Sequence, residues 1–180
     1  MGILSVGAAL GPAGVWAALF HVWSNGLTKG ALFLSAGNMR RAAGARTMDE
    51  VSGMAIITPR SAAIFVTGLF AVTACPPFAP FFSELRVIRA AFAANRNGAA
   101  AIFLGCLLFV FFGLTRLVFA IVDGRPRPAS RATARRFPET MSVILPPLAL
   151  LLLSLWLGLA TPAVIRDAWT GAVNQLFPTP

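Results

Sequence analysis

Apolar residues in this chain fall into long blocks that short polar segments separate. The longest blocks cover residues 15–37, 98–122 and 143–160. An α-helix rises about 1.5 Å per residue, so about 20 apolar residues cross the hydrocarbon core of a bilayer. The pattern therefore predicts an all-α fold, a polytopic bundle of transmembrane helices in which these three blocks are spans.

Shorter apolar segments lie at both ends of the chain. Residues 1–10 are too few to span a bilayer and predict a partial first helix, which the turn signal Gly11-Pro12-Ala13-Gly14 follows. Residues 161–180 carry apolar side chains at roughly helical spacing among polar ones. They predict a tail helix that either lies at the membrane interface or packs against a neighbour. Residues 1–160 are then the transmembrane bundle.

The block at residues 61–94 is interrupted by Pro76, Pro77 and Pro80. Prolines lack the backbone donor and bar a continuous helix. Two arrangements satisfy this pattern: two spans joined by a tight turn, or one span made of two half-helices.

Charge decides between the two arrangements. One broken span places the arginine-rich loops 38–60 and 123–140 on the same side of the membrane, whereas two spans place them on opposite sides. The positive-inside rule therefore favours one broken helix, with both loops in the cytoplasm. Arg96 then faces the other side of the membrane, one arginine against the nine of the two loops.

Composition and charge agree with an integral membrane protein. Of the 180 residues, 57% are apolar and only 12% are charged, whereas a soluble domain carries about 25% charged residues. A net charge of +9 suits a nucleic-acid-binding protein, but nine of the fifteen basic residues lie in the two loops. We therefore expect the lipid bilayer, and no nucleic acid, as the environment of this chain.

Three polar residues within the first long block share one helical face. His21, Asn25 and Lys29 are spaced at i, i+4 and i+8, and Lys29 is the only lysine in the chain. Ionisable residues inside a membrane are costly and usually functional, and a lysine, unlike an arginine, is able to release its proton there. The spacing predicts a proton relay. The alternative is that Lys29 extends toward the interface and His21 bonds a neighbouring carbonyl.

Glu84 follows the proline interruption. A carboxylate beside a broken helix is able to exchange a proton with water, because free backbone groups survive at that depth only where they are buried or line a wet cavity. Arg86 and Arg89 lie close in sequence and are candidates to tune it. The alternative is an ion pair between Glu84 and an arginine that holds the half-helices together.

Signals for catalysis are missing from the sequence. It has no glycine-rich phosphate loop and no nucleophile with a matching base. Cys75 and Cys106 lie in apolar stretches outside any CxxC or Cys/His cluster. We expect no catalytic residue, no metal site and no cofactor in this chain.

Three segments together resemble a known family. They are PPFAPFFSE at residues 76–84, MDEVSGM at 48–54 and HVWSNGLTKGALFLSAG at 21–37. They are similar to the broken helix, the connecting loop and the lysine-bearing helix of antiporter-like subunits. Such subunits move protons in respiratory complex I, in membrane-bound nickel–iron hydrogenases and in Mrp cation/proton antiporters. The chain resembles the C-terminal part of such a subunit, most of all in the hydrogenase-4 component F type.

This resemblance implies a role for each candidate residue. Lys29 is the central relay lysine, His21 and Asn25 are its neighbours on the path, and Glu84 is the terminal proton-exchanging residue. Asn25 stands where many members have a second histidine, so water is expected to complete the relay there. The family's first half-channel, with its glutamate–lysine pair, is not found in these residues.

The function expected from the resemblance is a C-terminal half-channel for protons. The chain would be part of a redox-driven oxidoreductase complex of the hydrogenase or NADH dehydrogenase type in a bacterial inner membrane, with no redox centre of its own. Its partners would be other membrane subunits and hydrophilic redox subunits. The alternatives are a self-contained cation/proton antiporter that uses the same residues, and a scaffold that transports nothing.

Overall fold

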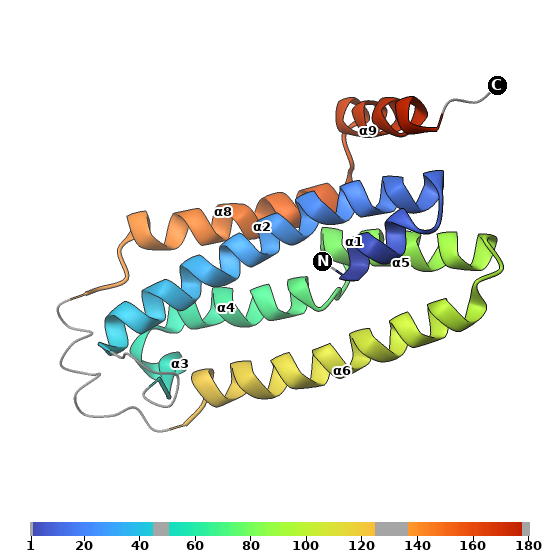
Figure 1. The fold of residues 1–180 in the computed structure, drawn as a ribbon. Coiled ribbons are helices and arrows are strands. Elements are labelled where there is room, and N and C mark those ends of the chain that lie inside the picture. Colours follow the sequence, from blue (N-terminus) through green and yellow to red (C-terminus); the bar gives the residue numbers. More distant parts are fainter. Residues whose placement is uncertain (1, 45–50, 125–136, 178–180) are drawn as a thin grey trace.

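The computed structural model describes residues 2–44, 51–124 and 137–177, and every regular element in these ranges is a helix (Figure 1). In chain order these are α1 (Gly2–Ala8), α2 (Pro12–Ala43), α3 (Met54–Ile57), α4 (Pro59–Val72), α5 (Ala79–Ala93), α6 (Asn97–Val122), α8 (Met141–Leu159) and α9 (Ala163–Leu176). Both α6 and α8 are long and apolar enough to cross a membrane. The predicted all-α fold is confirmed.

α2 is longer than the apolar block from which it was predicted. It begins with Pro12, since proline is favoured at the first position of a helix, and ends at Ala43, where Gly44 caps it in the left-handed conformation at φ 64°. The helix continues past residue 37, where the apolar block ends, and the Asn38 side chain donates to the Val143 carbonyl. With 32 residues, α2 is about 48 Å long, more than a bilayer core needs.

α2 is the central helix of the bundle, and α1, α4, α5, α8 and α9 all pack against it. α1 returns over the start of α2 at a close crossing of two glycines. A Cβ atom on Gly7 would stand 2.8 Å from the Gly14 carbonyl oxygen. Only glycine allows the two backbones to approach so closely.

The helix at residues 61–94 is broken as the prolines predict. α4 ends at Val72, and α5 begins at Ala79 and continues in the same direction (Figure 1). Backbone N–H groups of the break find acceptors nearby in the chain. Cys75 N–H donates to the Phe70 carbonyl, and Phe78 N–H donates to the Cys75 carbonyl. α8 closes over the break, since a Cβ on Gly158 would collide with the Pro77 carbonyl and stand 2.8 Å from Ala79 N.

At one end of the bundle lie the start of α4, the start of α8 and the ends of α2 and α6 (Figure 1). There the Glu139 carboxylate accepts hydrogen bonds from the backbone N–H groups of Arg60 and Ser61, at 3.1 and 2.6 Å. Both arginine-rich loops join the bundle at this end, as the broken helix requires. Of these loops, residues 45–50 and 125–136 lie outside the described residues, and residues 38–43 are helical.

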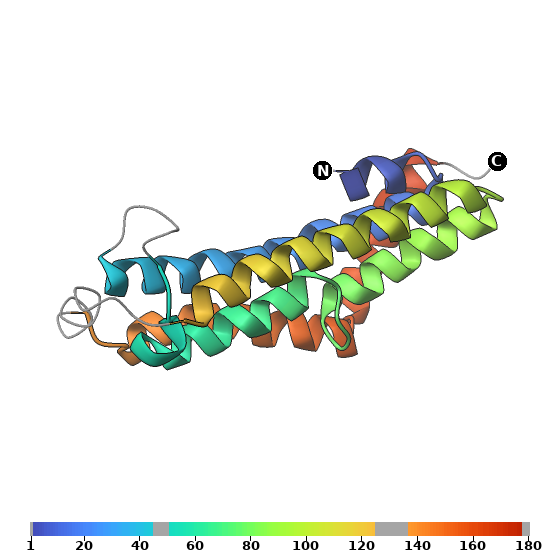
Figure 2. The same ribbon diagram turned by 90° about the horizontal axis from the view of Figure 1, so that it is seen from below.

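α6 runs alongside both halves of the broken helix (Figure 2). Its outer face is strongly apolar and exposed, with Ile102 71% and Phe109 82% exposed. Such a face suits contact with lipid or with another membrane helix.

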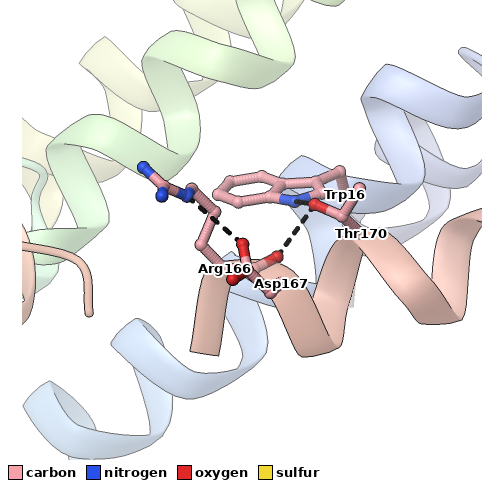
Figure 3. Close-up of polar contacts among 4 residues, drawn as sticks. All are labelled: Trp16, Arg166, Asp167 and Thr170. Carbon is pink, nitrogen blue, oxygen red and sulfur yellow. Dashed lines mark hydrogen bonds and ion pairs between the residues drawn. The ribbon is translucent and has the colours of Figure 1, made fainter. Parts of the chain in front are cut away.

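The tail helix α9 packs against the first turns of α2. Trp169 and Val173 are buried, and the Trp169 ring meets the Trp16 ring edge-on at 5.5 Å between centroids. Figure 3 shows the Trp16 indole N–H donating to the Thr170 hydroxyl at 3.3 Å. The tail helix therefore packs against a neighbouring helix, which was one of the two alternatives for residues 161–180. Its location at the membrane interface stays a prediction.

Candidate functional site

The helical spacing of α2 positions the three predicted relay residues. His21 is buried, Asn25 is half-buried and Lys29 is exposed, with consecutive side chains one turn apart along the same face. Between them the hydroxyls of Ser24 and Thr28 bond to carbonyls of their own helix. The hydroxyls of Ser24 and Thr28 are therefore satisfied within α2.

A cavity of about 730 Å³ joins the four predicted site residues. His21, Asn25 and Lys29 line it from α2, and Glu84 lines it from α5. The remaining wall is almost entirely apolar and comes from α1, from the end of α4 and from α6. Residues 63 positions apart in sequence, His21 and Glu84, thus face the same space. A volume of this size holds many water molecules beside the polar groups.

His21 is fixed by a contact that the sequence did not predict. Its Nδ1 atom lies 2.9 Å from Ser83 Oγ, and the Ser83 hydroxyl donates to the Pro80 carbonyl at 2.8 Å. Since a hydroxyl has one proton to donate, Ser83 accepts from the His21 Nδ1–H group. The neutral ring therefore presents the Nε2 lone pair as its remaining acceptor.

Ser83 was overlooked because serine is common within helices and carries no charge. The available signal was its place, since it is a polar residue in the first turn after the proline interruption. Ser24 also comes within 3.4 Å of the Ser83 hydroxyl, so α2 and α5 share a small hydroxyl cluster beside the imidazole. This cluster is fully buried.

Glu84 lies between two cavities. It is 5% exposed, and in the described part of the chain neither a hydrogen-bond donor nor a cation is paired with it. Together with Leu107 it also lines a second cavity of about 300 Å³, which reaches Thr73 and Ala74 of the break. A carboxyl group in this position is able to take a proton from one space and release it to the other.

Arg86 and Arg89 do not line the cavity of Lys29. Residues two apart on a helix point to different sides, and the Arg86 guanidinium lies over the Trp16 ring at 4.1 Å from its centroid. Among the described residues, the ion pair is Arg166–Asp167, so the alternative of a Glu84–arginine pair finds no support. Tuning of Glu84 by these arginines stays a prediction.

Comparison with known proteins places this chain among membrane subunits. Residues 1–122 match the family described as "NADH:quinone oxidoreductase/Mrp antiporter, TM". Hydrogenase-4 component B of Escherichia coli K12 is 32% identical over 148 residues, which are 77% of this chain and 22% of that protein. NADH-quinone oxidoreductase subunit N of Desulforudis audaxviator is 29% identical over 188 residues, 99% of this chain and 38% of that protein.

A solved structure shares the fold over nearly the whole chain. The Mrp complex from Dietzia sp. DQ12-45-1b contains a chain that superposes with a TM-score of 0.81 at 25% identity. The match covers 99% of this chain and 41% of that one. This chain therefore spans less than half the length of the proteins that it matches here.

Proposed function

Because this chain belongs to the family of NADH:quinone oxidoreductase and Mrp antiporter transmembrane subunits, we propose that it forms a half-channel for protons. The family resemblance predicted from the sequence is confirmed, and the relatives are antiporter-like membrane subunits of complex I, hydrogenase and Mrp assemblies. The assignment to the component F type stays a prediction. The proton path, its residues and the complex to which it belongs are our proposal.

The observation that carries the proposal is the shared cavity of His21, Asn25, Lys29 and Glu84. Three of these groups are able to hold a proton, and they come from two helices that meet at the proline break. The rest of the cavity wall is almost entirely apolar, so these four residues supply most of its polar groups. A merely structural cluster would pair these charges with one another or with carbonyl groups.

Each residue has a distinct part in the proposed path. The Lys29 ammonium releases a proton to water in the cavity, with Asn25 holding that water by its amide. The His21 Nε2 atom, two turns along α2 and about 12 Å away along the helix axis, accepts a proton and returns it. Glu84 then takes the proton and releases it to the second cavity, next to the break.

The proposed setting is a redox-driven complex in a bacterial inner membrane. Other membrane subunits would cover the exposed apolar face of α6, and hydrophilic redox subunits would supply the energy. The arginine-rich end, with Arg40, Arg41 and Arg60, would face the cytoplasm by the positive-inside rule. A second candidate is a cation/proton antiporter without a redox partner, which the likeness to the Mrp complex favours.

Proton movement into membrane vesicles that contain the complete assembly tests the proposal. Glu84→Gln removes the exchangeable proton, and we expect it to abolish proton uptake while assembly stays normal. Asp167→Asn is the matched control, because this carboxylate is exposed on α9 and pairs with Arg166. Unchanged uptake in Glu84→Gln would instead identify the chain as a scaffold.

The same vesicles separate the two transport candidates. Uptake that requires a redox donor supports the redox-driven pump. Uptake that a sodium gradient drives without a donor, and that Glu84→Gln still abolishes, supports the antiporter.

A further inference from the structure

A second, separate feature lies between α2 and α5, away from the proposed proton path. It is a groove of about 370 Å³ lined by Ala13, Trp16, Arg86, Arg89, Ala90 and Ala93. Two of its six residues are arginines and none is acidic. Neither arginine lines the cavity that holds Lys29 and Glu84.

The guanidinium of Arg86 is held in place by aromatic rings. It lies over the Trp16 ring at 4.1 Å from the centroid and over the Phe20 ring at 5.3 Å. Stacking occupies the face of the guanidinium and leaves its in-plane N–H groups able to donate. Trp16 is itself fixed by its bond to Thr170 of α9 (Figure 3).

The donors of both arginines are unused within the described residues. Neither Arg86 nor Arg89 has a hydrogen-bonded acceptor or a carboxylate partner there. The two residues are three positions apart on one helix, so their side chains leave the same face of α5. Two neighbouring positive charges repel each other, and an anion between them would remove that repulsion.

The groove lies near one end of the bundle, where we expect the headgroup region of a bilayer. α2 starts and α5 ends at this end of the bundle, opposite the arginine-rich loops (Figure 1). Arg86 and Arg89 stand about 10 and 6 Å before the end of α5, which is within reach of the interface for a long side chain. Trp16, at the start of α2, and Trp169, on α9, belong to the same end, as expected of an interfacial aromatic belt.

We propose that this groove binds the phosphate of an anionic phospholipid. The paired guanidinium groups would donate in-plane hydrogen bonds to its oxygens, and the small side chains of Ala13, Ala90 and Ala93 leave room for the glycerol and the first acyl carbons. Both occupants are anionic, so charge does not separate them; the place at the end of the bundle and the neighbouring tryptophans favour a lipid headgroup over a carboxylate from a neighbouring subunit. The proposal requires only that the chain is embedded in a membrane, and it does not depend on the proton path.

Native mass spectrometry of the detergent-purified full chain with added phosphatidylglycerol tests this site. The double variant Arg86→Gln and Arg89→Gln removes both donors, and the affinity for the lipid should fall about tenfold or more. Arg166→Gln is the matched control, because it removes an exposed arginine at the same end of the bundle that already pairs with Asp167. Its lipid binding should stay unchanged, and millimolar inorganic phosphate should not displace the lipid.

Four results would overturn the proposal. The first is equal lipid binding by the double variant, and the second is an equal loss in Arg166→Gln, which would indicate general attraction to the surface. The third is displacement by inorganic phosphate, which would indicate a site for free anions. The fourth is a crosslink to a neighbouring protein, and not to lipid, from a photoreactive label attached to Ala93→Cys in native membranes. If the double variant does not fold, the single variant Arg89→Gln is tested in its place, because Arg89 is exposed. Its affinity for the lipid should also fall.

Discussion

The His21 ring and the Ser83 hydroxyl join the first half of α2 to the N-terminal part of α5, with 2.9 Å between Nδ1 and Oγ. This bond connects the lysine-bearing helix with the helix that resumes after the proline break. It brings Glu84, the next residue along the chain, to the cavity that His21 lines. The orientation of the imidazole thus depends on the geometry of the break.

Loss of this bond should slow proton movement without unfolding the bundle. Ser83→Ala leaves the buried Nδ1–H group without its acceptor, at a cost of about 1–3 kcal/mol. We expect proton uptake in vesicles to fall about tenfold, since about 1.4 kcal/mol corresponds to one factor of ten. Ser83→Thr keeps the hydroxyl and should retain most of the uptake. Equal uptake by Ser83→Ala and the unmodified chain would show that the bond does not position the ring.

The contact of α8 with the break predicts a strong effect at a single glycine. Gly158→Ala places a Cβ atom against the Pro77 carbonyl and Ala79 N, and both are backbone atoms that cannot move aside alone. We expect a loss of about 1–3 kcal/mol in the free energy of unfolding, measured by denaturation in detergent.

Gly105→Ala on α6 is the control for that substitution. Nothing lies within 4 Å of a Cβ atom at Gly105, so alanine there should raise stability slightly through its helix propensity. Equal stability changes at the two glycines would contradict the close packing of α8 on the break.

The hydrogen bonds of the Glu139 carboxylate predict a stability effect at the end of the bundle where the arginine-rich loops join it. It accepts two backbone N–H groups at the start of α4, which have no partner within the helix. Glu139→Ala should lower the free energy of unfolding by about 1–2 kcal/mol, as for the loss of a helix cap. Glu139→Gln keeps one acceptor oxygen and should cost less. Equal stability of Glu139→Ala and the unmodified chain in detergent denaturation would exclude this role.

Prolines and charge were sufficient to predict the broken helix. Pro76, Pro77 and Pro80 remove three backbone donors within five residues, and with one broken span both arginine-rich loops had to meet at one end of the bundle. The shared face of His21, Asn25 and Lys29 also followed from spacing alone. These features depend on local backbone chemistry and helical periodicity, which a sequence carries directly.

Features that depend on contacts between distant segments could not be predicted from the sequence. The bond between the Asn38 side chain and the Val143 carbonyl joins residues more than 100 positions apart. Arg86 was expected near Glu84 and lies over Trp16, because the packing of α2 against α5 places an aromatic ring there. The contact of Ser83 with His21 depends on the packing of α5 against α2, which no local pattern in the sequence indicates.

Lys29→Arg in membrane vesicles tests the central claim most directly. Arginine keeps the positive charge and much of the length of Lys29 but does not release its proton. We expect proton uptake to fall to the level of vesicles without the protein, with normal assembly, whereas Arg166→Lys, an exchange of the same two residue types on α9, leaves uptake unchanged. Uptake by Lys29→Arg at the rate of the unmodified chain would contradict a relay through this lysine.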